Sequence, residues 1–127
     1  MSITNVSIIM PAYNSSRWIS DSIQSVLDQY YEQWELLIVD DGSTDQTAAL
    51  AQEAGAVVIR HLRRKGYDHA INSGIEFARR QKLDAVITFD ADGQHQISEI
   101  DSVLAPLIEN KADIVLYYIL KLYFLFD

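Results

Sequence analysis

The sequence predicts an α/β fold, a doubly wound and mainly parallel sheet. Two observations predict this fold class. Apolar strand-like segments alternate with helix-like segments four times, with short connections between them. Most of the strand-like segments are apolar on both faces, which is typical of a parallel sheet that helices cover on both sides. The chain of 127 residues, 49% of them hydrophobic, is long enough for one such domain.

The first half of the chain carries two strand–helix pairs. Residues 6–10 are a β-branched apolar segment, and apolar side chains recur with helical spacing over residues 19–27. A second apolar strand is expected over residues 34–39. Ser43, with Gln46 three residues later, predicts a capping box at the start of the next helix.

The second half repeats this pattern. Residues 57–59 predict a third strand, and small or apolar side chains return with helical spacing over residues 70–78. A fourth strand is expected over residues 85–89. It is followed by a helix over residues 98–108, whose internal proline should bend the axis, and residues 114–116 would begin a fifth strand.

Composition excludes several classes of function. The chain has 10 Lys and Arg against 18 Asp and Glu, a net charge of −8 that argues against binding to nucleic acid. It has no cysteine, which excludes disulfides, thiolate catalysis and cysteine-based zinc sites. We find no signal-peptide pattern, and the longest apolar stretch, residues 114–126, is too short to cross a bilayer as a helix. We therefore expect a cytoplasmic protein.

Polar segments follow four of the expected strands. They are Pro11-Ala12-Tyr13-Asn14, Asp40-Asp41-Gly42-Ser43, the loop from Arg63 to Gly66, and Asp90-Ala91-Asp92. One cleft could collect all four, because parallel strands place their carboxyl ends along the same edge of the sheet. Asp90 and Asp92 would repel each other unless a proton or a cation lies between them. The pair therefore indicates a clamp for a diphosphate and a hard ion such as Mg²⁺ or Mn²⁺, although an acidic turn explains the pair alone equally well.

The other polar residues leave alternatives open. Asp40 and Asp41 could bind a ligand or cap the following helix. Tyr13 could stack on a base or fill the edge of the core. The basic residues 63–65 could neutralise a phosphate or remain solvated, and His61 is expected to be structural or solvated. No phosphate-loop motif for ATP or for a dinucleotide is present.

Three of these segments, in this order, resemble the family 2 inverting glycosyltransferases of the GT-A fold. They are VSIIMPAYN at residues 6–14, IVDDGSTD at residues 38–45 and FDADGQH at residues 89–95. The Asp-Ala-Asp-Gly-Gln-His form and the Lys65-Gly66 loop look most like the polyprenyl-phosphate or dolichyl-phosphate sugar transferases. The resemblance covers about residues 4–115.

The resemblance implies a set of ligand-binding residues. Those expected to bind a nucleotide-sugar are Pro11, Ala12, Tyr13, Asn14, Asp40, Asp41, Gly66, Asp90, Ala91 and Asp92, and those expected to bind Mg²⁺ or Mn²⁺ are Asp90, Asp92 and Gln94. The implied reaction transfers a sugar from a UDP- or GDP-sugar to a polyprenyl phosphate or a saccharide by inverting displacement, with the metal stabilising the leaving diphosphate. This implies a role in cell-envelope polysaccharide or lipid-linked sugar synthesis, with peripheral association at the inner face of the membrane.

The C-terminal segment departs from the family pattern. After residues 112–115 the family continues into a Gly-Ser-Arg-like segment, whereas this chain continues into an apolar tail. We therefore expect an incomplete glycosyltransferase domain over residues 1–115 and an atypical tail over residues 116–127. The acceptor-binding residues and the catalytic base are expected in the missing half, so the chain would be truncated and inactive alone. The tail should pack against a second copy in a homodimer or fold back over the sheet edge.

Two other functions compete with this interpretation. A receiver-type phosphoacceptor signalling module has a similar length and a doubly wound sheet. Its acidic pair should follow the first strand, however, where Pro-Ala-Tyr-Asn stands in this chain. The other alternative is a non-catalytic nucleotide-binding fragment.

Overall fold

A sheet forms the centre of the part of the chain that the computed structural model describes, which is residues 6–28, 34–82, 85–88, 115–116 and 121–125. The strands are β1 (Val6–Ala12), β2 (Trp34–Asp40), β3 (Val57–Arg60), β4 (Ala85–Thr88), β5 (Val115–Leu116) and β6 (Lys121–Leu125). Within this part of the chain they form one six-stranded sheet in the order β3-β2-β1-β4-β6-β5. The helices described with it are α1 (Ile19–Leu27), α2 (Thr47–Glu53) and α3 (Tyr67–Arg80).

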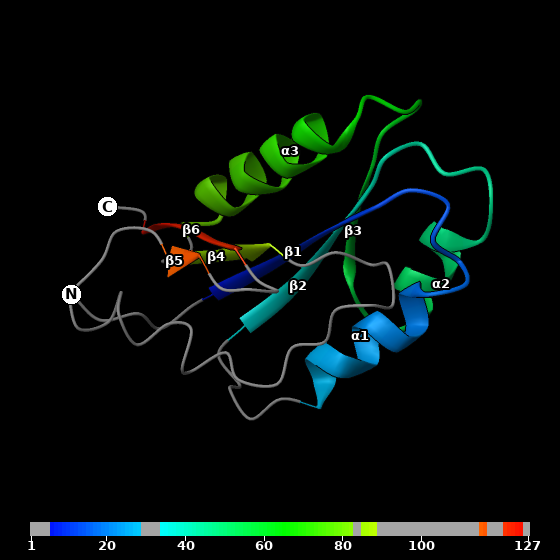
Figure 1. Cartoon of the computed structure of the whole chain (residues 1–127), viewed down its shortest axis with the longest axis horizontal. Coiled ribbons are helices and arrows are strands. Elements are labelled where there is room, and N and C mark those ends of the chain that lie inside the picture. Colours follow the sequence, from blue (N-terminus) through cyan, green and yellow to red (C-terminus); the bar gives the residue numbers. More distant parts are fainter. Residues whose placement is uncertain (1–5, 29–33, 83–84, 89–114, 117–120, 126–127) are drawn as a thin grey trace.

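The four strands from β3 to β4 run parallel, as the sequence predicts. Ile8 of β1 lies opposite Leu36 of β2 on one side and Ile87 of β4 on the other. Helices cover both faces, with α3 on one face and α1 and α2 on the other (Figure 1). The prediction of an α/β, doubly wound and mainly parallel sheet is therefore confirmed.

Alternating side chains of the strands form one core on each face of the sheet. On one face, Ile8 and Met10 pack with Ile19 and Ile23 of α1. The other face forms a separate cluster, in which Ile9, Leu37, Val39 and Val86 of the strands pack with Ala70, Ile71 and Ala78 of α3. Successive strand residues point to opposite faces, so a strand buried on both faces is mainly apolar. This is why β1 is apolar at every position except Ser7.

The helix boundaries differ in part from the prediction. The expected capping box is wrong, because α2 begins at Thr47 and its N-cap, Gln46, makes no side-chain capping bond. Ser43 is engaged elsewhere, since its hydroxyl accepts a hydrogen bond from Asn14 N. Beyond the end of α2, Gly55 adopts a left-handed φ of +88° that favours glycine. The expected helix over residues 98–108, with its proline bend, lies outside the described residues.

The apolar tail folds back onto the sheet. In β6, Lys121 lies opposite Thr88 and Leu122 opposite Ile87 in antiparallel pairing with β4, and β5 pairs with the other side of β6. Of the two expected arrangements, the structure therefore shows the fold-back over the sheet edge. Nothing in the described residues supports the other expected arrangement, a homodimer in which the tail packs against a second copy. The division of the chain after residue 115 stays a prediction.

Within the described ranges, no helix has the length and apolar character needed to span a membrane.

Candidate functional site

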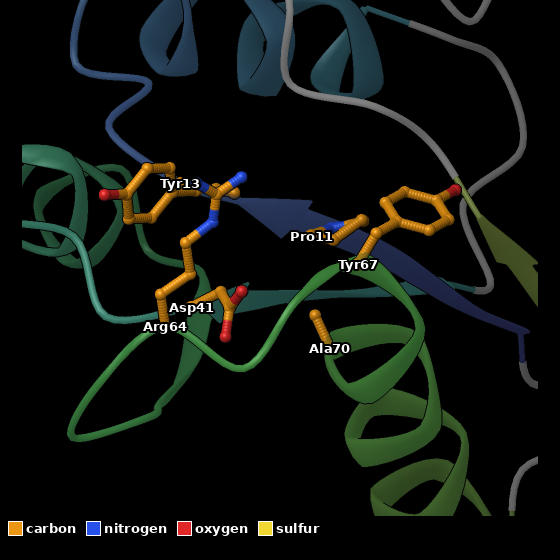
Figure 2. Close-up of a pocket in the computed structure, with 7 residues that line it drawn as sticks. Pro11, Tyr13, Asp41, Arg64, Tyr67 and Ala70 are labelled. Atoms are coloured by element: carbon orange, nitrogen blue, oxygen red, sulfur yellow. The ribbon is translucent and has the colours of Figure 1, made fainter.

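A pocket of about 130 Å³ lies at the carboxyl ends of β1 and β2. It is lined by Pro11, Ala12, Tyr13, Asp41, Arg64, Tyr67 and Ala70 (Figure 2). These residues come from the end of β1, the turn after β2, and the loop that leads from β3 into α3. The structure therefore brings three of the four polar segments to one place, as expected for a parallel sheet.

The Asp41 carboxylate is the most heavily bonded group in this pocket. Its Oδ1 accepts hydrogen bonds from His61 Nδ1 and from the backbone N–H of Lys65, and its Oδ2 accepts one from the backbone N–H of Gly66. All three distances are 2.8 Å. Asp41 therefore holds the loop between β3 and α3 against the turn that follows β2.

Hydrogen bonding keeps Asp41 ionised in spite of its burial. Burial alone raises the pKa of the carboxyl. The hydrogen bonds from His61, Lys65 and Gly66, together with the charge on His61, outweigh burial, so the pKa is lowered from its ordinary value. Asp41 is therefore an acceptor, and His61 must carry a proton on Nδ1 to donate to it.

His61 is buried and bonded through both ring nitrogens. Its Nε2 lies 2.9 Å from the Ser73 hydroxyl of α3, on the side of the ring away from Asp41. Of the two expected roles for His61, structural or solvated, the structure shows the structural one. This histidine links the end of β3 to α3.

Two close approaches fix the loop that carries Arg64. Gly42 has a φ of +77°, and a Cβ atom at this position would lie 2.5 Å from the carbonyl carbon of Arg63 and from the backbone nitrogen of Arg64. The Arg64 guanidinium in turn lies 4.1 Å from the centroid of the Tyr13 ring. Tyr13 is 38% exposed, so this stacked pair forms part of the open wall of the pocket.

The turns after β1 and β2 are joined by side-chain hydrogen bonds. Asn14, at a left-handed φ of 48°, accepts a hydrogen bond from Thr44 N at 2.9 Å through Oδ1. Ser15 N donates to Thr47 Oγ1 at 2.8 Å, and Ser16 N donates to Asp45 Oδ2 at 3.2 Å. The Asn14 side chain therefore braces the turn that positions Tyr13.

Asp40 does not line the pocket. It is fully buried; its Oδ1 accepts from Ser43 N at 3.1 Å, and its Oδ2 lies 3.4 Å from Arg60 Nε. The structure thus separates the two adjacent aspartates, with Asp41 at the pocket and Asp40 in the turn beneath it. Asp40 stabilises the turn, and a contact between Asp40 and a nucleotide has no support in this arrangement.

The remaining predicted residues divide into two groups. Pro11, Ala12, Tyr13 and Asp41 line the pocket, and Gly66 contributes its N–H to Asp41. The others, Asp90, Ala91, Asp92 and Gln94, lie outside the described residues. Within the described part of the chain, no group of three His, Asp or Glu side chains could hold a metal ion.

Sequence reasoning missed two pocket residues, Tyr67 and Ala70. Both lie in the first turn of α3, directly after the loop that Asp41 holds. Ala70 is indistinguishable in sequence from the core positions of its helix. The position of Tyr67, one residue after Gly66 at the start of a helix, was the available signal.

Comparison with known proteins places the chain among glycosyltransferases. The model of the family "Glycosyl transferase family 2" matches residues 7–121. A UDP-Glc:alpha-D-GlcNAc-diphosphoundecaprenol beta-1,3-glucosyltransferase of Escherichia coli is 45% identical over 108 residues, which are 83% of this chain and 42% of that protein. A UDP-N-acetylglucosamine–dolichyl-phosphate N-acetylglucosaminyltransferase of Methanococcus voltae is 30% identical over 125 residues, 85% of this chain and 49% of that protein.

A solved structure supports the same assignment. The mannosyltransferase from Pyrobaculum calidifontis, in complex with GDP-Man and Mn²⁺, is similar with a TM-score of 0.63 and 26% identity over 72% of this chain and 28% of that one. The chain spans less than half of the length of each of these three proteins.

Proposed function

The chain belongs to glycosyl transferase family 2 and has the GT-A fold, and we propose that its pocket binds the nucleotide part of a nucleotide-diphospho-sugar. The observation that carries this proposal is the convergence of Tyr13, Asp41 and Arg64 in one pocket at the carboxyl ends of β1 and β2. Membership of this family argues against the alternative of a receiver-type phosphoacceptor module, which would also need an acidic pair after the first strand.

Each of these three side chains offers a different contact to a nucleotide. The Tyr13 ring offers a flat apolar surface for a base. The ionised Asp41 accepts hydrogen bonds and therefore suits an N–H group of the base or a hydroxyl of the ribose. Arg64 donates hydrogen bonds only, and so suits the carbonyl oxygens of a base. Together they offer a nucleoside a stacking surface, a hydrogen-bond acceptor and a hydrogen-bond donor.

We propose that Asp90 and Asp92, with Gln94, hold Mg²⁺ or Mn²⁺ beside the diphosphate. Carboxylate and amide oxygens suit a hard divalent cation. When bound, the ion would stabilise the negative charge that develops on the leaving diphosphate during inverting displacement. The structural relative that contains both GDP-Man and Mn²⁺ supports this part of the proposal.

For the acceptor, we propose a polyprenyl phosphate or a lipid-linked saccharide. The names of the two relatives from E. coli and M. voltae specify acceptors of these kinds. Such an acceptor would bring the reaction to the cytoplasmic face of a membrane, with the protein associated peripherally. Because the chain spans less than half of each relative, we assign nucleotide binding to this chain and leave the catalytic base unassigned.

Isothermal titration calorimetry with UDP and GDP, in Mn²⁺ and in EDTA, tests the proposal. We expect binding in Mn²⁺ that weakens at least about tenfold in EDTA or in Asp92→Asn, because EDTA removes the cation beside the diphosphate and the substitution removes a negative charge that holds this cation. Asp21→Asn is the matched control, since Asp21 is exposed in the first turn of α1 and its substitution removes the same charge. Equal affinity in EDTA and in Mn²⁺ would refute the metal site.

A further inference from the structure

We propose that the loop between β3 and α3 is a membrane-contact site, in which Leu62 enters an anionic lipid bilayer while Arg63 and Lys65 bind the lipid phosphates. The choice of a bilayer as the partner rests on the proposed function, because a lipid-linked acceptor would bring this edge of the sheet to a membrane. The inference adds the surface through which the protein makes that contact.

Leu62 is the most exposed large apolar side chain in the part of the chain that the structure describes. Its relative exposure is 103%, whereas the next most exposed, Leu27, reaches 50%. Single exposed apolar residues are common on protein surfaces, so exposure alone indicates no partner. The evidence for a partner comes from the loop that carries Leu62.

The backbone is fixed on both sides of Leu62. Before it, the N–H of His61 donates to the carbonyl oxygen of Asp40 at 2.9 Å. After it, the N–H of Lys65 donates to the Asp41 carboxylate at 2.8 Å. The green segment between β3 and α3 extends beyond the sheet in Figure 1. The loop therefore presents Leu62 outward in a preformed conformation, and ordering it on a bilayer would cost little.

Positive charge follows this apolar residue directly. Arg63, Arg64 and Lys65 are consecutive, and residues 61–66 contain no acidic residue, although the whole chain has a net charge of −8. The Arg64 guanidinium stacks on Tyr13, whereas Arg63 and Lys65 are exposed and form no ion pair within the described ranges. Basic side chains next to an anionic membrane are attracted to it. Exposed charges farther away than the Debye length, about 8 Å at physiological ionic strength, are largely screened, so the acidic remainder of the chain opposes the contact only weakly.

A lipid bilayer fits this loop better than a protein partner does. A specific protein interface buries about 800 Å² on each partner and has an apolar centre. Leu62 lies between His61 and Arg63, so the loop offers one apolar side chain and no such centre. A bilayer accepts a single apolar side chain, and the strength of binding grows with the apolar area inserted and with the basic charge beside it.

The contact would lie beside the nucleotide pocket. Arg64 belongs to the same loop and lines that pocket. Insertion of Leu62 would therefore hold the open wall of the pocket close to the lipid surface, where a lipid-linked acceptor has its phosphate. Because only one apolar side chain inserts, the contact would be reversible.

Co-sedimentation with lipid vesicles tests this inference. We expect vesicles of phosphatidylcholine and phosphatidylglycerol to bind the protein at least about tenfold more tightly than vesicles of phosphatidylcholine alone, because only the mixed vesicles are anionic. Added NaCl should weaken binding to the mixed vesicles.

Leu62→Ser tests the apolar part of the contact. It should weaken binding to mixed vesicles at least about fivefold, because it removes the side chain that enters the bilayer. Leu27→Ser is the matched control, since Leu27 is half-exposed at the end of α1 and lies beside the first residues of β2 and β3, away from the loop. This control should bind mixed vesicles as the wild type does.

A double variant, Arg63→Gln with Lys65→Gln, tests the charge. It should weaken binding to mixed vesicles at least about tenfold, because two basic side chains no longer meet the lipid phosphates. Arg79→Gln with Arg80→Gln removes the same charge from the last turn of α3 and should bind as the wild type does.

Leu62→Trp gives a direct readout of insertion. Its tryptophan emission, taken as the difference from the wild type, should shift to shorter wavelength with mixed vesicles, because the ring leaves water for the interface. An unshifted emission while the protein is bound to the vesicles would overturn the inference.

The outcomes separate this inference from the proposed function. Wild-type binding of mixed vesicles by Leu62→Ser, or equal binding of the two kinds of vesicle, would overturn the inference. Calorimetry with UDP on the same samples reports on the proposed function independently, and Leu62→Ser should keep wild-type affinity for UDP. If UDP binds and vesicles do not, the inference fails alone. If vesicles bind as expected and no nucleotide binds, the proposed function fails and the membrane contact stands.

Discussion

Gly42→Ala should destabilise the fold and weaken nucleotide binding, because Gly42 is where the turn after β2 meets the loop that carries Arg64. A Cβ atom at Gly42 would lie 2.5 Å from two backbone atoms of this loop, the carbonyl carbon of Arg63 and the nitrogen of Arg64. Backbone atoms cannot swing away as the end of a side chain can. The loop must therefore shift as a unit, and with it the N–H groups that bond to Asp41.

Gly55→Ala is the matched control for the cost of backbone strain. Gly55 has a φ of +88°, close to the +77° of Gly42, but a Cβ atom there would have no neighbour within 4 Å. An alanine in the left-handed region costs about 1–2 kcal/mol at either position. Overpacking adds about 1–3 kcal/mol at Gly42 alone. We therefore expect a loss of about 1–2 kcal/mol in Gly55→Ala and about 2–5 kcal/mol in Gly42→Ala.

Urea unfolding measures the free energy of unfolding of both variants, and calorimetry measures their affinity for UDP. We expect Gly42→Ala to lose at least about tenfold in affinity, because it displaces two of the three donors that fix Asp41. Gly55→Ala should keep wild-type affinity, since Gly55 follows the far end of α2 and does not line the pocket. Equal destabilisation of the two variants, with unchanged UDP affinity in Gly42→Ala, would refute this reasoning.

Two further predictions concern stability. Burial raises the pKa of Asp45, but hydrogen bonds from Thr47 and Ser16 outweigh it and lower the pKa to about 2. The folded-state pKa lies below the unfolded value, so the stabilisation is complete above about pH 4 and is lost as the pH falls towards 2. Between pH 5 and pH 2.5 the wild type should lose about 1–2 kcal/mol more stability than Asp45→Asn in urea unfolding, and equal losses would contradict this account. Gly74→Ala would place a Cβ atom 2.5 Å from Ile9 Cγ2. We expect this variant to be less stable than the wild type in urea unfolding, because an overpacking cost of about 1–3 kcal/mol should exceed the gain of about 1 kcal/mol in helix propensity. A variant more stable than the wild type would show that α3 can move away from β1.

The parallel part of the fold could be predicted because its determinants are local. A strand buried on both faces is mainly apolar, and β1 and β2 have that pattern, interrupted by Ser7 in β1 and by Glu35 near the start of β2. The direction of β6 has no such signature, since an apolar β-prone segment suits parallel and antiparallel pairing equally. The sequence therefore left open whether the tail would pack against a second copy or fold back on the sheet, and it did not indicate antiparallel pairing with β4.

The candidate site could be predicted in outline but not in its bonding. Asp41 could be placed at the sheet edge, because it follows an apolar strand. The capping box failed because Ser43 bonds to Asn14, a residue 29 positions away in the chain. The three donors to Asp41 are equally non-local, since they lie 20, 24 and 25 positions away. Contacts of this kind follow from the packing of two loops, and no local sequence pattern predicts them.

The same hydrogen bonds that fold the loop also prepare Asp41 for a ligand. Because the carboxylate is fixed and its pKa is lowered, a nucleotide would meet an acceptor that is already charged and oriented, and ordering it would cost little on binding. The dependence is mutual, since without Asp41 the N–H groups of Lys65 and Gly66 lose their acceptor and Arg64 loses its position. A substitution at Asp41 therefore changes loop structure and ligand contact together.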